Sequence, residues 1–397
     1  MREDEIREFM EYQKKEIPEK VNKIGWILIF IGFVLSVLSY LVDSLRGSYN
    51  ILIIFTFLIS ISVGSIFLVA LEYATGAVWS TPMRRVSEFL SASFPFIIIL
   101  AIPLLLNIQN IFEWSKPAIV QMDKIIAHKS PYLNVPFFII RFVITAVIFY
   151  IFYKVLTRNS QKQDISGDQK LTSKNIKFSM AFMPVAAILL SLIATDWLMS
   201  LAPKWYSTIF GFYFMTGVIL AGLSATTYVV VTLNENGYFV PKLTGEHYYS
   251  LGALMFAFIN FWAYIAFSQF LLIWYANIPE ETIWFMARWQ GSWKYITIAS
   301  VFIHFVIPYA ALLSQPSKMN PKRLKFMAIW ILFAQIFDLY WIIMPNMSSS
   351  IVFSWNEIGF PVLVIGIIVV VFCAQYKKYN LMPIRDPKLE RGIKFHL

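Results

Sequence analysis

Residues 189–211 of the chain read LLSLIATDWLMSLAPKWYSTIFG. The stretch begins as an apolar helix that carries an acid, Asp196, and leaves through a Pro-Lys-Trp-Tyr turn into a second apolar run. A carboxylate inside a membrane costs about 2.5–3.5 kcal/mol on insertion scales, so it lies near the bilayer interface, is paired, or has a function. The sequence therefore raises one main question, which is the state of Asp196.

The composition of the whole chain is that of a membrane protein. Of its 397 residues, 58% are hydrophobic and 17% are aromatic, whereas only 14% are charged, which is far from the average of soluble domains. The net charge of +10 then indicates basic loops on one side of a membrane, and no nucleic-acid partner is expected. The single cysteine, Cys373, excludes a disulfide framework and a four-cysteine metal site within the chain.

Ten apolar runs are long enough to cross a bilayer, which takes about 20 residues. We therefore expect an all-α integral membrane protein with ten transmembrane helices. The runs cover residues 24–42, 51–74, 86–106, 135–156, 179–201, 209–233, 249–276, 293–313, 325–345 and 357–376.

The distribution of lysine and arginine predicts the orientation. With the N-terminus inside, the inner segments hold 25 of these residues and the outer segments 7, while Arg141 within a span completes the 33. Cytoplasmic loops carry the excess of Lys and Arg in membrane proteins. Both termini are therefore predicted to be cytoplasmic.

The runs also divide the chain into five parts. These are an amphipathic cytoplasmic tail (1–23), the first four spans (24–156), a polar and flexible cytoplasmic linker (157–178), spans five to ten (179–376) and a cytoplasmic tail (377–397). In addition, an acid and aromatic residues open a span in RRVSEFLSASFPF and again in TGEHYYSLGALMFAF. This likeness indicates either an internal repeat or two aromatic-rich span starts that look alike by composition.

Two charged residues lie in early spans. Glu72 is near the inner end of span two, and two arginines follow that span; it either takes up protons or is an interfacial acid paired with those arginines. Arg141 is about six residues, roughly 9 Å, inside span four. It either snorkels outward as an anchor or pairs with an acid at a compatible depth, Asp196 or Asp338.

The depth of Asp196 follows from its position in span five. It is about 17 residues, roughly 25 Å, from the cytoplasmic end of the span, which places it in the outer quarter. A functional role for this carboxylate competes with a structural hydrogen bond to the turn at residues 204–208.

His304 is the only histidine inside a predicted span, about midway through span eight. Thr297 and Ser300 share its helical face. Pro308 follows four residues later, so the carbonyl of His304 loses its helical donor. These features favour a ligand or proton site, and the alternative is a histidine that packs between helices.

Two further polar faces lie in neighbouring spans. Gln335 and Asp338 are three residues apart in span nine, and Asn260, Tyr264 and Ser268 line one face of span seven. Such faces make helix–helix hydrogen bonds worth about 0.6 kcal/mol each. Because Asp338 and His304 lie in adjoining spans, these polar faces could instead line a hydrated path through the membrane.

Redox and nucleotide motifs are missing from the sequence. Paired histidines for a membrane-bound haem are absent, since the other three histidines lie in loops or the tail. The sequence also lacks a Walker A motif, a dinucleotide glycine fingerprint and HExxH. We therefore expect no redox centre, bound metal or cofactor held by this chain itself.

Three long runs resemble a known family: SLIATDWLMSLAPKWYSTIFGFYF (191–214), FWAYIAFSQFLLIWYANIPEETIWF (261–285) and LEYATGAVWSTPMRR (71–85). They resemble the ActF family, which is the second NrfD-like membrane subunit of bacterial alternative complex III, and the resemblance covers essentially the whole chain. The resemblance implies a fold similar to the polysulfide-reductase membrane anchor, with two four-helix bundles and flanking helices. It also implies the bacterial inner membrane as the location.

The resemblance further implies a quinol:cytochrome c (or high-potential iron–sulfur protein) oxidoreductase of respiration. Its haem c and iron–sulfur clusters would lie on partner subunits, namely a sister NrfD-like subunit, an iron–sulfur subunit and cytochrome c subunits. We favour a proton path through Glu72, His304, Asp338 and Asp196, with Arg141 modulating an acid, over quinol oxidation in this chain. Quinol binding, a secondary transporter and a scaffold remain the alternatives.

Overall fold

The computed structural model describes residues 15–396, so most of the tail predicted for residues 1–23 lies outside them. The described residues contain no β-strand. They form ten helices long and apolar enough to cross a membrane, which confirms the predicted fold class.

The ten spans follow each other along the chain, and the longest connection, between α5 and α9, holds short helices of its own. The spans are α2 (Glu19–Val42), α3 (Ser44–Thr75), α4 with α5 (Arg84–Ser91 and Pro95–Leu106), α9 (Val135–Ser166), α10 (Lys170–Ile193), α11 (Phe210–Glu235), α12 (Gly245–Ala276), α14 with α15 (Trp293–Val301 and Ile307–Ala311), α17 (Pro321–Ile343) and α18 (Gly359–Lys378). A π-helical segment and a 3₁₀ turn extend α10 to Leu201.

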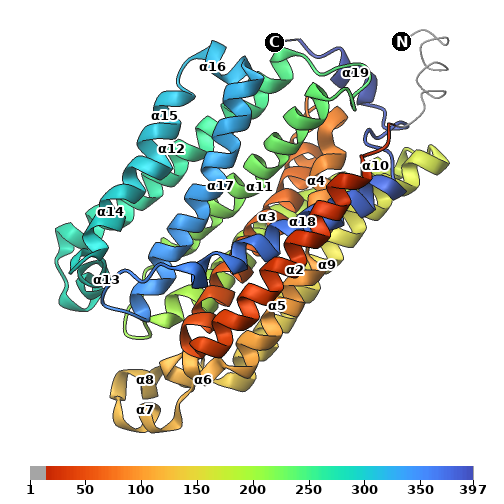
Figure 1. The fold of residues 1–397 in the computed structure, drawn as a ribbon. Helices are drawn as coiled ribbons and strands as arrows, with labels where there is room; N and C mark the ends of the chain where they lie inside the picture. Colours follow the sequence, from red (N-terminus) through yellow and green to blue (C-terminus); the bar gives the residue numbers. More distant parts are fainter. Residues whose placement is uncertain (1–14, 397) are drawn as a thin grey trace.

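The spans pack as two four-helix groups. The first group holds α3, α4–α5, α9 and α10, and the second holds α11, α12, α14–α15 and α17. Helices α3 and α11 pack against each other and join the groups, while α2 and α18 pair alongside (Figure 1). This arrangement agrees with the predicted two bundles and flanking helices.

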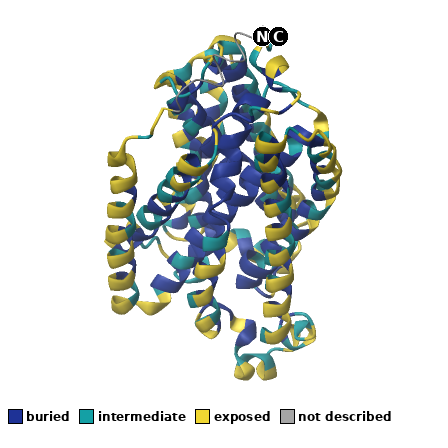
Figure 2. Ribbon diagram, turned by 90° about the vertical axis from the view of Figure 1, so that its right-hand side faces the viewer, coloured by how far each residue is buried: buried dark blue, intermediate teal, exposed yellow. Residues whose placement is uncertain are grey.

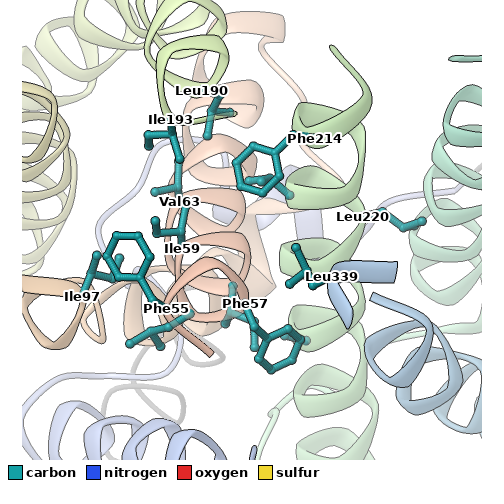
Figure 3. Packing of buried hydrophobic residues seen from close by; sticks show 14 of the residues in the cluster. Phe55, Phe57, Ile59, Val63, Ile97, Leu190, Ile193, Phe214, Leu220 and Leu339 are labelled. Carbon is teal, nitrogen blue, oxygen red and sulfur yellow. The ribbon is translucent and has the colours of Figure 1, made fainter. Parts of the chain in front are cut away.

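The core follows the contact between α3 and α11. These two spans are the most buried, whereas the outer helices expose apolar faces (Figure 2). Their large side chains interlock with those of α10 and α17 (Figure 3). A Cβ atom on Gly64 would lie 2.2 Å from the carbonyl oxygen of Val218, and one on Gly222 would lie 2.4 Å from the carbonyl carbon of Gly64. Only glycine permits this approach, as at small-residue contacts in membranes generally.

Short helices cover the two ends of the bundle. The first and last described residues, Lys15 and His396, lie at one end, here called the tail end, with α16 (Gln315–Met319) and α19 (Leu389–Ile393) (Figure 1). The opposite end, here called the far end, carries α6 (Ile108–Ile111), α7 (Pro117–Met122), α8 (Lys124–Lys129) and α13 (Pro279–Trp289).

The prediction of a flexible linker at residues 157–178 is wrong. Helix α9 continues to Ser166, a left-handed Gly167 (φ 70°) ends it, and α10 begins at Lys170. Polar side chains join the two arms: Asn159 donates to Asn175 at 2.8 Å and Gln163 to Thr172 at 2.7 Å. The polar composition of this region therefore serves helix pairing.

Candidate functional site

Asp196 and Arg141 form a buried ion pair in the first group. Arg141 Nε lies 2.8 Å from one carboxylate oxygen of Asp196 and Nη2 lies 2.9 Å from the other, and both residues are at least 90% buried. Asp196 lies in a π-helical segment, Ala194–Leu198, which turns its side chain towards α9. The pairing alternative is thus confirmed with Asp196 as the partner, and Arg141 does not snorkel outward.

Tyr132 completes this pair from the loop before α9. Its hydroxyl donates to Asp196 at 3.1 Å, its carbonyl accepts from Arg141 at 2.8 Å, and its ring lies 3.8 Å from the guanidinium carbon. Burial, followed by the charge of Asp196, raises the pKa of Tyr132 to about 12, so its O–H remains a donor. The predicted bond from the Asp196 side chain to the turn at 204–208 is replaced by these contacts.

Asp338 occupies a different environment in the second group. It is 2% exposed on α17 and accepts a hydrogen bond from the Tyr213 hydroxyl of α11. No lysine or arginine within residues 15–396 forms a salt bridge with it. Asp338 is therefore held by a hydrogen bond, whereas Asp196 is held by a charge.

A buried arginine that the sequence did not single out lies nearby on α13. Arg288 is 1% exposed, and its guanidinium donates to the carbonyls of Ile342 at 2.6 Å, Trp284 at 2.9 Å and Trp341 at 3.2 Å. Two of these carbonyls belong to the last turn of α17, where a cation stabilises the helix dipole. Its position in an outer connection gave no signal of burial.

His304 lies flat against Trp262 of α12. The ring centroids are 3.8 Å apart at an interplanar angle of 8°, and Trp262 in turn lies 5.7 Å from the ring of Tyr213. His304 is 1% exposed, and neither ring nitrogen has a hydrogen-bond partner among the described residues. The aromatic contacts thus connect His304 to the Tyr213–Asp338 pair.

The backbone around His304 differs from the expectation. Phe302–Val306 form a π-helical segment, which moves the missing proline donor by one residue, to the carbonyl of Ile303. Trp330 of α17 satisfies that carbonyl through its indole N–H at 2.8 Å. Thr297, predicted to share a face with His304, accepts from the indole of Trp341 at 2.8 Å.

The polar face predicted on span seven is only partly buried. Tyr264 is 65% exposed and lies outside the second group's interior, whereas Asn260 and Ser268 are half-buried, and Asn260 donates to the carbonyl of Phe256 within its own helix at 2.7 Å. A hydrated path through Tyr264 is therefore not supported. Gln335, in contrast, is buried against Gly217, where an added Cβ would lie 2.8 Å from its Oε1.

Glu72 lies at the tail end in a buried network of charges. Thr81 at 2.9 Å and Arg84 at 2.8 Å both donate to its Oε1 atom. Arg84 also pairs with Glu88 at 3.3 Å and with Asp386 of the C-terminal tail at 2.7 Å. The pairing reading of Glu72 is confirmed for Arg84. The second arginine instead binds two other acids: Arg85 lies 2.7 Å from Glu88 and 2.7 Å from Asp164.

A cavity of about 290 Å³ adjoins this network. Apolar residues form most of its wall, several of them from α3, α11 and α12, and its polar lining includes Glu72, Ser80, Arg84, Ser87 and Thr226. Ser87 and Thr226 are 3.1 Å apart and link α4 to α11.

Hydroxyl groups continue along the contact between α3 and α11. Three buried hydroxyls, on Ser65 of α3 and on Ser224 and Thr227 of α11, have no partner among the described residues, while Ser62 of α3 lies 2.6 Å from Ser93 in the turn between α4 and α5. On α11, the 13 residues from Tyr213 to Thr226 correspond to about 20 Å. Polar groups therefore recur between the cavity and Asp338.

The predicted site residues thus fall into three places. Asp338 and His304 are brought together in the second group, Asp196 and Arg141 in the first, and Glu72 lies at the tail end. Within residues 15–396 no group of three or more His, Cys, Asp or Glu side chains could hold a metal ion. No family model matches the chain, and no curated protein matches it either. The resemblance to ActF therefore stays a prediction.

Proposed function

We propose that the chain is a membrane subunit of a respiratory quinol:cytochrome c oxidoreductase complex and supplies a proton path across the membrane. The observation that carries the proposal is Asp338, a buried acid with a tyrosine donor and no cation paired to it. Embedded acids of this kind are functional by default. The resemblance to ActF supplies the complex, the bacterial inner membrane and the cytoplasmic side for the tail end.

In the proposed path, protons enter at the tail end and leave at the far end. The cavity beside Glu72 receives them, the hydroxyls between α3 and α11 conduct them with water, and Asp338 with Tyr213 is the last acid. Unpartnered buried hydroxyls support this route because such groups are normally satisfied by ordered water. Asp196 supports the fold beside the path, since Arg141 occupies both of its oxygens.

The test measures proton release per electron by the intact complex in liposomes. Asp338→Asn should lower the ratio while quinol oxidation and assembly persist. The matched control is Asp123→Asn, which removes an acid at the far end that pairs with Lys204 at 2.6 Å. An unchanged ratio in Asp338→Asn would exclude the relay.

Complex membership has its own test. Affinity purification through a tag on this chain should bring haem-bearing and iron–sulfur subunits with it. A secondary transporter would purify alone. In a scaffold, neutralising Asp338 would change stability and leave turnover and proton release intact.

One observation favours quinol binding as a second candidate. The cavity beside Glu72 has apolar walls, an acceptor carboxylate and several hydroxyls, a combination typical of small-molecule sites. Glu72→Gln should then lower the quinone that copurifies with the complex. A changed proton ratio with unchanged quinone content would assign the cavity to proton entry.

A further inference from the structure

The outer faces of the α9–α10 hairpin carry a concentration of positive charge. Six exposed cations lie between residues 154 and 177: Lys154, Arg158 and Lys162 on α9, and Lys170, Lys174 and Lys177 on α10. The spacings of four, four, four and three residues place each set along one stripe of its helix. None of the six forms a salt bridge within residues 15–396.

The acids of the hairpin do not balance these cations. The carboxylate of Asp164 turns inward to Arg85 at 2.7 Å. Asp168 accepts from the backbone N–H of Lys170 at 2.9 Å and is the only acid on the outer surface between residues 154 and 177. The neutral polar side chains of the hairpin, such as Asn159 and Gln163, form hydrogen bonds between its two helices and so leave the outer face to the cations.

Helix length places the stripes at the level of lipid headgroups. From Val135, Lys154 and Lys162 lie roughly 28 and 40 Å along α9, at 1.5 Å per residue. Counted back from Leu201, Lys177 and Lys170 lie roughly 36 and 46 Å along α10. Because the hydrocarbon layer is about 30 Å thick, both arms carry their cations from its edge outward. The innermost cations, Lys154 and Lys177, lie within a Debye length of the charged surface, where its attraction acts.

One cation on each arm has its ammonium near aromatic rings of the same helix. Lys154 Nζ is 5.4 Å from the ring of Tyr150 and 5.3 Å from that of Tyr153, and Lys174 Nζ is 5.9 Å from that of Phe178. Aromatic rings with neighbouring lysines are typical of the membrane interface, where the ammonium reaches lipid phosphates.

We propose that the outer faces of the α9–α10 hairpin bind anionic phospholipid headgroups. Clusters of four to eight basic residues next to a span fit such lipids. The depth of the two stripes favours the membrane over an acidic protein surface, since the stripes begin at the hydrocarbon edge on both arms.

The experiment compares lipid binding by the full chain in nanodiscs of phosphatidylcholine with and without phosphatidylglycerol. Native mass spectrometry of the released protein counts the retained lipids. Wild type should retain phosphatidylglycerol preferentially, and 0.5 M salt should abolish the preference. Since each basic residue near an anionic surface contributes about a fivefold gain in binding, Lys154→Gln/Arg158→Gln/Lys177→Gln should weaken retention at least about tenfold.

The matched control removes three exposed cations elsewhere at the tail end, Lys20→Gln/Lys23→Gln/Lys322→Gln. This variant should keep the preference. Equal retention by both triple variants, or a preference that survives high salt, would overturn the proposal. Loss of a copurifying protein with unchanged lipid retention would assign the stripes to a protein partner and overturn it as well. The salt titration on wild type decides the case if the hairpin variant fails to fold.

Discussion

Asp196 and Asp338 occupy matching places in the two four-helix groups and are held in different ways. Each lies on the last span of its group, and a proline follows each by seven residues, Pro203 and Pro345. Each accepts a tyrosine O–H as well. Arg141 binds both oxygens of Asp196, whereas the arginine near Asp338, Arg288, binds backbone carbonyls.

The difference shows how one position in a fold can be built for stability or left for chemistry. A bidentate pair fixes the carboxylate and requires its partner, because a buried charge without compensation is costly. A carboxylate held by neutral donors, with no cation on its oxygens, can still exchange a proton with a neighbouring group or water. The following variants test that contrast, beginning with the largest expected effect.

Arg141→Met should destabilise the protein most. It leaves the Asp196 carboxylate buried without a cation, which costs about 3–5 kcal/mol in the free energy of unfolding. Equilibrium unfolding in mixed micelles measures the loss. The double variant Arg141→Met/Asp196→Leu should recover most of it, since apolar replacements of a whole buried pair are neutral or better. A single variant as stable as wild type would show that the pair contributes nothing.

Arg288→Met should cost about 2 kcal/mol, because two carbonyls in the last turn of α17 lose their donors. The cost is smaller than for Arg141→Met since those carbonyls carry no net charge. Adding Asp338→Asn should restore nothing if Arg288 serves the backbone. Recovery in that double variant would show instead that Arg288 and Asp338 act as an ion pair, which would remove the contrast between the groups.

The sequence could predict the ten spans and, of the two acids compared, the possible pairing of Asp196 with Arg141. Apolar length located all ten spans, and counting residues from the span ends placed Arg141 at a depth that allowed pairing with Asp196. Depth alone could not choose between two acids at similar depth, because the choice depends on which helices touch.

Contacts between segments far apart in the chain could not be predicted from the sequence. Asp386 lies in a tail 302 residues from its partner Arg84, and Arg288 lies in a connection that folds back under α17. Composition also failed for the α9–α10 hairpin, because polar residues that pair two helices look like those of a loop.

Asp338→Asn should change the free energy of unfolding by less than about 1 kcal/mol, because the amide oxygen still accepts from Tyr213. Asp196→Asn should cost about 2 kcal/mol or more, since it removes the charge that Arg141 faces. Unfolding curves of the two variants, recorded in the same detergent, give the comparison. Equal losses would contradict the view that the two acids are held differently.

His304→Phe should have the smallest effect on stability, within about 1 kcal/mol of wild type. Its ring nitrogens have no partner among the described residues, so little hydrogen bonding is lost, and phenylalanine keeps the stacking on Trp262. The matched control is His247→Phe. In the wild type the His247 Nε2 atom lies 2.9 Å from the carbonyl oxygen of Gly392, and losing this hydrogen bond should lower the free energy of unfolding by about 1–2 kcal/mol. A loss for His304→Phe as large as that of the control would make His304 a structural residue. Unchanged stability with lowered proton release would place it beside Asp338 in the path.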